Sequence, residues 1–384
     1  MKKKQIVCLS TSPWYPIPTR KQQVMSRLHD AEVLYFDPPI TWIAPLKDHS
    51  AKEKLWAHKK PGQHVRDGIT VYTLPPVWPF FNKFRWINRH NQKKTARYVR
   101  KIMEKHGFEK PLLWTYSPVS ADAVDLIPHS ALVYDCVDLH SAYGGLMNPA
   151  LVDEMERDLA GKADQVFATA EGLSDRLRKV NDSVQFIPNG ANFELFERAS
   201  HPCPCPEDLK AIPKPILGFV GALQPCIEYS WLEAAARAKP EWSFVLIGGE
   251  KPGADLGGLR TLPNVHFLGL RPHEELPDYI AQFDVCLNLF ARTKLSKDVS
   301  PLKFYEYLAT GKPVVSTPQP AQILQFDPII HIARTREDFL AACGKAIGDT
   351  APERTEARLE AGRCSSWDAR VAEMEEILRG KDLL

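Results

Sequence analysis

Long apolar runs and a surplus of one charge are both missing from the sequence. No stretch approaches the roughly eighteen apolar residues that cross a bilayer, and the apolar residues 5–10 are too few for a signal peptide. The 49 lysine and arginine residues nearly balance the 47 aspartate and glutamate residues, for a net charge of +2. General nucleic-acid binding therefore has no support, and a cytoplasmic protein is expected.

Cysteine pairs at metal-ligand spacing and glycine-rich nucleotide loops are missing as well. The eight cysteines are scattered, several of them in apolar segments, which is typical of free thiols in a reducing cytoplasm. Cys203-Pro204-Cys205 lacks both CxxC spacing and a second ligand pair, so we interpret it as part of a linker. No Gly-x-Gly-x-x-Gly occurs, which disfavours nicotinamide binding. We expect neither a bound metal nor a cofactor.

What the sequence does contain is an alternation of short β-branched or aromatic runs with helical patterns. The first series of runs lies at residues 6–10, 33–36, 112–116, 131–134, 165–168 and 184–187. The second series lies at residues 216–221, 244–247, 265–268, 285–289 and 314–316. Alternating strands and helices form parallel sheets that are covered on both faces. The 384 residues suffice for two such α/β domains.

Two Rossmann-like, doubly wound domains are therefore predicted, with a junction in a proline-rich stretch. The expected parts are an N-terminal domain over residues 1–200, a linker over 201–213, a C-terminal domain over 214–364, and a C-terminal helix within 365–384 that crosses back to the N-terminal domain. Open α/β sheets bind ligands at the carboxyl ends of their strands. We expect the two domains to face an interdomain cleft in which substrates meet.

Residues 298–317 carry the most informative pattern, a loop, a helix, a tight turn and a strand. Ser300 suits the N-cap and Pro301 the first helical turn, which leaves backbone N–H groups directed at whatever precedes the helix. A diphosphate fits that position, Lys303 would add a positive charge, and Glu306 could accept hydrogen bonds from a ribose diol. A solvated amphipathic helix explains the same residues, so the pattern alone leaves both interpretations open.

This segment resembles the donor-binding helix of GT-B glycosyltransferases, particularly GT4-like enzymes. Their pattern has an acidic residue, seven intervening positions, then a glutamate before a Gly-x-Pro-Val-Val strand. Asp298 and Glu306 occupy the two acidic positions, and residues 311–315 read Gly-Lys-Pro-Val-Val. Residues 218–223 and 265–269 resemble further segments of the same domain in the same order. The resemblance implies a GT-B fold and favours the interpretation as a binding site.

The resemblance also assigns a nucleoside-diphosphate sugar as the donor, with a UDP-sugar favoured. The residues that it implies for donor binding are Gly221, Asp298, Ser300, Pro301, Leu302, Lys303 and Glu306. Asp298 would approach the sugar and Glu306 the ribose. Asp298 stands where glutamate is usual, and residues 222–226 lack the arginine and lysine that often clamp the phosphates. We therefore expect the phosphate charge to fall on Lys303 and the helix N-terminus.

The acceptor side is expected where the strand at residues 131–134 ends. Asp138 is our first candidate and Asp135 our second for a base that removes the acceptor hydroxyl proton, although a helix cap and a structural pair explain the same residues. Residues 12–23 resemble the first loop of bacterial glycosyltransferases, in which Arg20 and Gln22 are the matching positions. Together with Trp14, for which a core role is an equal alternative, they are expected to bind the acceptor.

Residues 83–105 form a basic, aromatic-containing helical stretch that either lies on anionic lipid or is simply solvated. Resemblance to enzymes that build lipid-linked polysaccharide favours peripheral contact with the inner face of the membrane. Asp-x-Asp, the metal-binding signature of the GT-A architecture, is absent, so a metal-independent enzyme is expected. The predicted function is transfer of a hexose to a glycan or lipid-linked acceptor in cell-surface polysaccharide assembly. A non-catalytic subunit of an assembly complex and a nucleotide-sugar epimerase or hydrolase are the alternatives.

Overall fold

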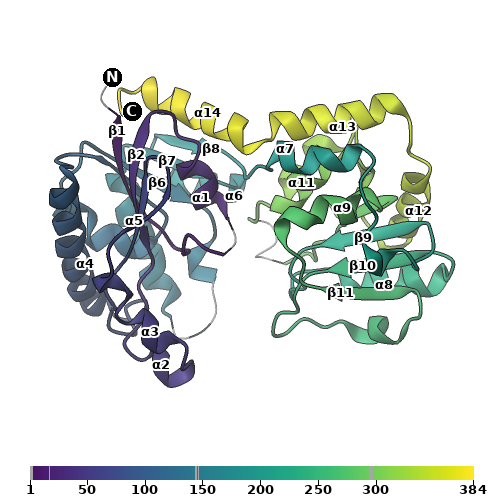
Figure 1. The fold of residues 1–384 in the computed structure, drawn as a ribbon, viewed down its shortest axis with the longest axis horizontal. Coiled ribbons are helices and arrows are strands. Elements are labelled where there is room, and N and C mark those ends of the chain that lie inside the picture. The colour runs from purple at the N-terminus through teal and green to yellow at the C-terminus, as the bar shows by residue number, and fades with distance from the viewer. Residues whose placement is uncertain (1–2, 17, 143–144, 146, 294–297) are drawn as a thin grey trace. The chain divides into compact units, whose positions relative to one another are not determined.

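The computed structural model describes residues 3–16, 18–142, 145, 147–293 and 298–384, which fold into two compact α/β units (Figure 1). The first unit comprises Met1–Pro188 and Val371–Leu384, and the second comprises Asn189–Arg370. Each unit contains a doubly wound, mainly parallel sheet. The predicted fold class of two Rossmann-like domains is confirmed.

The sheet of the first unit has eight strands among its described residues, in the order β3-β4-β2-β1-β5-β6-β7-β8. The strands are β1 (Lys4–Leu9), β2 (Ala31–Asp37), β3 (Gln63–Arg66), β4 (Ile69–Thr73), β5 (Leu112–Thr115), β6 (Ala131–Cys136), β7 (Gln165–Ala168) and β8 (Val184–Phe186). Only β3 runs antiparallel to its neighbour among these pairs. The sequence analysis missed the hairpin β3–β4, whose polar edge strand lacks an apolar run.

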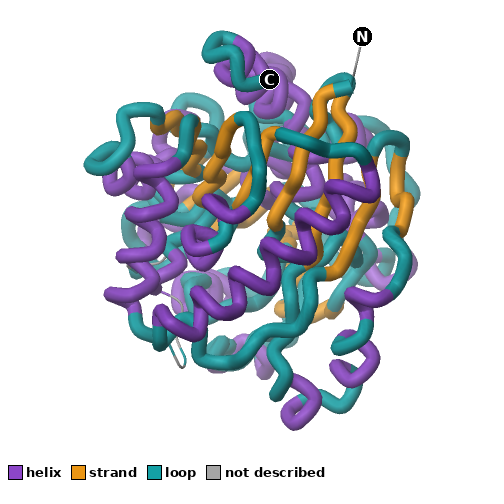
Figure 2. Tube along the Cα trace, turned by 90° about the vertical axis from the view of Figure 1, so that its left-hand side faces the viewer, coloured by secondary structure: helices purple, strands orange, loops and turns teal. Residues whose placement is uncertain are grey.

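Helices cover both faces of this sheet (Figure 2). The α-helices described in the unit are α1 (Arg20–Met25), α2 (Ala44–Lys47), α3 (Ala51–Lys54), α4 (Arg85–His106), α5 (Pro149–Lys162) and α6 (Glu171–Leu177). Helix α14 (Trp367–Arg379), near the end of the chain, belongs to the unit from Val371 onward. Apolar residues of α4 and α5, such as Val99 and Leu159, share one core with Val7 and Leu113 of the strands. This packing fixes α4 beside the carboxyl ends of β1 and β5.

The sheet of the second unit has six strands among its described residues, in the order β11-β10-β9-β12-β13-β14, and all pair in parallel. They are β9 (Ile216–Val220), β10 (Ser243–Ile247), β11 (Val265–Gly269), β12 (Val285–Asn288), β13 (Val314–Ser316) and β14 (His331–Ile332). The α-helices described there are α7 (Phe193–Glu197), α8 (Tyr229–Ala238), α9 (Leu276–Ala281), α11 (Leu302–Ala309), α12 (Arg336–Ile347) and α13 (Pro352–Cys364).

The boundaries of the two compact units differ from the domain boundaries proposed from the sequence. Residues 189–200 belong to the second unit, where Phe196 of α7 lies in the core. Ala191 donates its N–H to the carbonyl of Ser365 at 3.1 Å and accepts a hydrogen bond from Trp367 at 2.9 Å. The proline-rich stretch is not a bare spacer either, because Leu209 is buried in the same core. The end of the chain, Val371–Leu384, belongs to the first unit.

Candidate active site

Helix α11 begins at Leu302, one residue later than the sequence predicted. Pro301 is its N-cap residue and makes no side-chain capping bond. The Ser300 hydroxyl, which we expected to cap the helix, accepts hydrogen bonds from the backbone N–H of Asn189 at 2.9 Å and from Nε2 of Gln322 at 3.0 Å. No described side chain therefore satisfies the first N–H groups of α11, which point toward the segment before the helix.

The Lys303 side chain, in the first turn of α11, lies against two aromatic rings. Its Nζ atom is 3.7 Å from the ring centroid of Phe219 and 4.9 Å from that of Phe290. No carboxylate of the described residues lies within ion-pair distance of Nζ. Burial lowers the pKa of Lys303 to about 7, although Cys226 and Glu306 act in the opposite direction. A bound anion would restore the full charge of this amine.

Gly221 follows β9 and borders the same lysine. Its φ of 139° lies where side chains are strained, and a Cβ atom there would be 3.7 Å from Nζ of Lys303. Asp298 occupies a half-buried turn position before α11, next to residues 294–297, which lie outside the described part of the chain. Gly221, Ser300, Pro301, Leu302 and Lys303 thus come together around the start of α11.

Glu306 has a partner that the sequence analysis missed. Nε2 of His273 lies 3.1 Å from Oε1 of Glu306, and the imidazole packs edge-on against Phe196 with ring centroids 5.3 Å apart. Burial lowers the pKa of His273, but the hydrogen bond and the charge of Glu306 outweigh it, so the pKa is raised overall. No local pattern could have identified His273, because the pair joins residues from separate elements.

Asp135 lies in the interior of the first unit, which contradicts its candidacy as a base in contact with substrate. Its side chain is 0% exposed, and its two oxygens accept from Nε of Arg20 at 3.0 and 2.9 Å. Arg20 is itself 2% exposed and donates through Nη1 to the carbonyls of Ile187 and Pro188. Arg20 is therefore held within the protein through Nε and Nη1, while its buried Nη2 has no hydrogen-bond partner among the described residues.

Gln22 is also buried, contrary to its predicted place in an acceptor site. Its Oε1 accepts from the backbone N–H of Thr19 at 2.9 Å, and its Nε2 donates to the carbonyl of Pro13 at 2.6 Å. Gln22 thus closes a capping box at α1 and holds the preceding loop. Trp14 in that loop packs edge-on against Tyr35 at 4.9 Å and remains half-exposed.

Asp138 is the more accessible of the two predicted carboxylates. It is half-exposed, two residues beyond β6. Burial lowers the pKa of the nearby Lys21 amine, and this is the larger effect. The charge of Asp138 acts in the opposite direction and raises that pKa. His140 is a weak base in comparison, because burial, with Lys21 and Arg176, lowers its pKa to about 4. Asp138 is therefore the better placed proton acceptor at this edge of the sheet.

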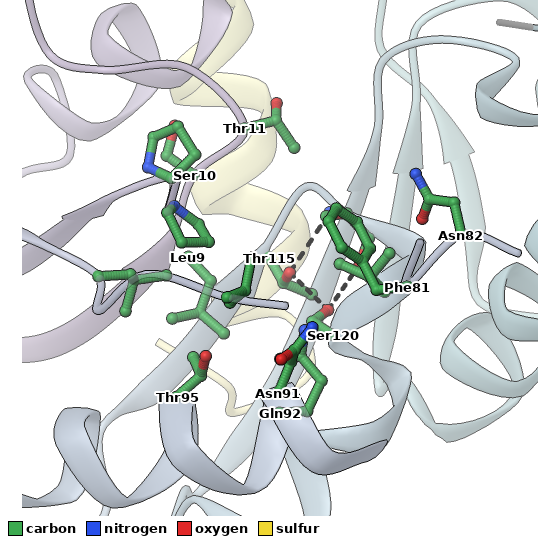
Figure 3. A pocket seen from close by; sticks show the side chains of 16 residues that line it. Leu9, Ser10, Thr11, Phe81, Asn82, Asn91, Gln92, Thr95, Thr115 and Ser120 are labelled. Atoms are coloured by element: carbon green, nitrogen blue, oxygen red, sulfur yellow. Dashed lines mark hydrogen bonds between the residues drawn. The ribbon is translucent and has the colours of Figure 1, made fainter. Parts of the chain in front are cut away.

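A pocket of about 200 Å³ opens in the first unit where four parallel strands end (Figure 3). Residues 9–11 at the end of β1, 38–39 after β2, Leu74 after β4 and Thr115 at the end of β5 line it. Helix α4 closes one side with Asn91, Gln92 and Thr95. The sequence analysis proposed none of these residues for a substrate site, because they are uncharged and follow no catalytic pattern. The structure adds them to the set of candidate functional residues.

The described residues provide no group of metal-ligating side chains at these sites. Among the described residues, no three histidine, cysteine, aspartate or glutamate side chains are grouped so that they could hold a metal ion. In the same part of the chain, no helix is both long and apolar enough to cross a bilayer.

Comparison with known proteins identifies the class. Residues 214–349 match the family described as group 1 glycosyl transferases. Sucrose-phosphate synthase from Thermosynechococcus elongatus has the same fold, with a TM-score of 0.71 and 17% identity over 98% of this chain and 99% of that one. Anabaena HepE, solved with UDP and glucose, aligns with a TM-score of 0.64 and 16% identity over 98% and 99% of the two chains. The chain is a glycosyltransferase with the GT-B fold.

A more specific likeness comes from a curated sequence. The chain is 29% identical over 359 residues to TuaH of Bacillus subtilis (strain 168), with 83% of this chain and 86% of TuaH covered. The name of TuaH describes a glycosyltransferase of teichuronic acid biosynthesis.

Proposed function

We propose that this glycosyltransferase moves a hexose from a UDP-sugar to a glycan or lipid-linked acceptor in the assembly of a cell-surface polysaccharide. The observation that carries the proposal is Lys303, a half-buried lysine at the start of α11 whose amine has no anionic partner among the described residues. A diphosphate supplies that partner. The name of TuaH supports the polysaccharide, and the UDP and glucose bound to HepE support the donor.

In this proposal the diphosphate lies between Gly221 and the first turn of α11. The free N–H groups of Leu302 and Lys303 donate to phosphate oxygens, while Ser300 and Pro301 fix the loop that leads into the helix. Glu306 accepts hydrogen bonds from the ribose diol, oriented by His273. Asp298 approaches the sugar. Lys303 and the helix dipole neutralise the phosphate charge, so transfer proceeds without a divalent metal or cofactor and should survive EDTA.

Asp138 removes the proton of the acceptor hydroxyl in this scheme. It stands at the carboxyl edge of the sheet, where α/β enzymes bind their substrates, and its side chain is half-exposed. Asp135 supports this edge from within through its pair with Arg20. Trp14, in the loop between β1 and α1, offers an aromatic face for a sugar ring.

Contact with an anionic membrane at the cytoplasmic face completes the proposal. The face of α4 away from the core is basic, with Arg89, Lys93, Arg97 and Arg100 exposed, and Trp86 at its start is 70% exposed. Arg85 does not contribute, because Asp122 and Asp158 bind it at 2.9 and 2.8 Å. A basic face beside exposed aromatic rings is typical of helices that lie on anionic lipid.

Calorimetric titration of UDP-glucose into the wild type and Lys303→Ala tests the donor site. Loss of one charge-assisted hydrogen bond to phosphate should weaken binding by about tenfold or more, since such bonds contribute about 1.5–3 kcal/mol. Lys345→Ala, at an exposed lysine of α12, is the control. Equal affinity in all three proteins would refute the donor site. Sugar release without any acceptor would instead favour an epimerase or hydrolase.

A further inference from the structure

Among the described residues, no ionisable side chain lines the pocket at the end of β1 and β5. Sixteen residues line it, and all are serine, threonine, asparagine, glutamine, proline, leucine, valine or phenylalanine. Burying a phosphate, a carboxylate or an ammonium group without a counter-charge costs several kcal/mol or more. The lining therefore disfavours a charged occupant.

Some polar groups in the pocket lack a partner within the protein. Gln92 is 8% exposed, and its Nε2 donates to Asn88 at 3.3 Å, but its Oε1 has no hydrogen bond among the described residues. The Thr95 hydroxyl, at 3% exposure, has none in the same set, and Oδ1 of Asn82 is buried without one. Buried polar atoms are rarely left unsatisfied in folded proteins, so Oδ1 of Asn82 calls for a ligand or for water, and the other two oxygens can also bind an occupant.

Neighbouring polar groups are satisfied and shape the walls instead. The amide of Asn91 is bound on both sides by backbone groups of Trp78, each at 3.0 Å. The hydroxyls of Thr115 and Ser120 are bonded to each other at 2.8 Å, as the dashed lines in Figure 3 show. The side-chain oxygens of Asn82, Gln92 and Thr95 are therefore available to an occupant.

The remaining walls are apolar, with Leu9, Leu74, Val77 and Phe81 among them. A pyranose ring offers hydroxyl or acetamido groups for hydrogen bonds and C–H faces for apolar contact. A volume of about 200 Å³ lies below the roughly 300 Å³ at which pockets for larger ligands begin, so it suits a single ring. An alkyl chain would leave the amide and the hydroxyl unsatisfied.

We propose that this pocket binds one uncharged sugar residue of the acceptor and discriminates against charged sugars. That the sugar belongs to an acceptor rests on the proposed glycosyl transfer, whereas its neutrality rests on the lining alone. Gln92 and Thr95 form the polar contacts, from one face of α4.

Saturation-transfer NMR on the full chain tests this directly, with methyl glucoside and methyl N-acetylglucosaminide as neutral probes. Methyl glucuronide and glucose 6-phosphate are the charged probes. We expect binding of at least one neutral glycoside and no signal from the charged ones. The variants Gln92→Leu and Thr95→Val together should weaken that binding about thirtyfold, because each hydrogen bond contributes about 1 kcal/mol.

Thr95→Ser keeps the hydroxyl and should retain binding, and His90→Leu, on the exposed face of α4, is the matched control. Binding of the charged probes as strong as that of the neutral ones, no binding of any neutral glycoside, or unchanged binding in the double variant would overturn the proposal. Stronger binding of an octyl chain than of the glycosides would also overturn it. UDP-glucose affinity, measured in the same samples, reports separately on the donor site, so failure of one proposal is distinguishable from failure of the other.

Discussion

At the residue scale, the pKa of Lys303 makes donor binding depend on pH. Burial holds this pKa at about 7, so the amine is largely neutral above that pH in the free protein. A bound diphosphate favours the protonated form, so binding above pH 7 must take up a proton. Affinity for UDP-glucose should therefore fall by up to about tenfold per pH unit above 7. Calorimetric titrations between pH 6 and 9, in buffers of different ionisation enthalpy, measure both the affinity and the number of protons taken up on binding.

The conservative variant Lys303→Arg is the control for this pH dependence. Arginine stays protonated throughout this pH range, so any binding that it retains should be independent of pH above 7. A flat affinity of the wild type from pH 6 to 9, without proton uptake, would contradict the role of Lys303.

Asp135 and Asp138 should respond to substitution in opposite ways. Asp135→Asn leaves the buried Arg20 without its counter-charge, and breaking a buried pair typically costs about 3–5 kcal/mol of stability. Asp138→Asn, at a half-exposed position, should leave the melting temperature nearly unchanged and lower turnover about 10²–10⁴-fold. Denaturant unfolding and a transfer assay on both variants separate the two roles. Full turnover in Asp138→Asn would exclude it as the base.

At the scale of elements, the exposed face of α4 gives the test of membrane contact. Changing Arg97, Arg100 and Lys101 to glutamine should weaken sedimentation with phosphatidylglycerol vesicles by more than about a hundredfold, since each basic side chain contributes about 1 kcal/mol near such a surface. The control neutralises Lys251, Arg334 and Lys345, which are exposed in the second unit. If the wild type does not sediment with anionic vesicles, or if both triple variants bind the vesicles equally, the basic face of α4 is only solvated.

The sequence predicted best those elements whose pattern is local. Buried parallel strands such as β9 are unbroken apolar runs, and α11 carries its own recognisable residues. The hairpin β3–β4 was missed although Asp67-Gly68 between its strands is a turn signal, because Gln63–Arg66 is a polar edge. The links of Glu306 with His273 and of Asp135 with Arg20 join distant segments, so only the fold reveals them. The same reason hid the neutral pocket.

At the scale of the whole molecule, the last segment of the chain should stabilise one unit only. Val371, Met374 and Leu378 of α14 are buried in the first unit, and Glu375 accepts the backbone N–H of His29 at 2.6 Å. Burying each apolar side chain contributes roughly 1.5–3 kcal/mol. Their sum is comparable to the roughly 5–15 kcal/mol that stabilises a whole domain. A chain ending at Arg370 should therefore lose the folded first unit.

The residues proposed to bind the donor all lie within Asn189–Arg370, which the truncation leaves intact. The shortened chain should therefore show an early melting transition, or none, for its first unit, while UDP-glucose still raises the melting temperature of the second. Differential scanning calorimetry with and without UDP-glucose resolves the two transitions. Glu376→Ala, on the exposed side of α14, should leave both unchanged. If the first unit of the truncated chain melts at the same temperature as in the full chain, Val371–Leu384 contributes little to the stability of the first unit. Because ligand binding raises the stability only of the part that folds around it, a shift confined to the second transition would assign the donor site to that unit.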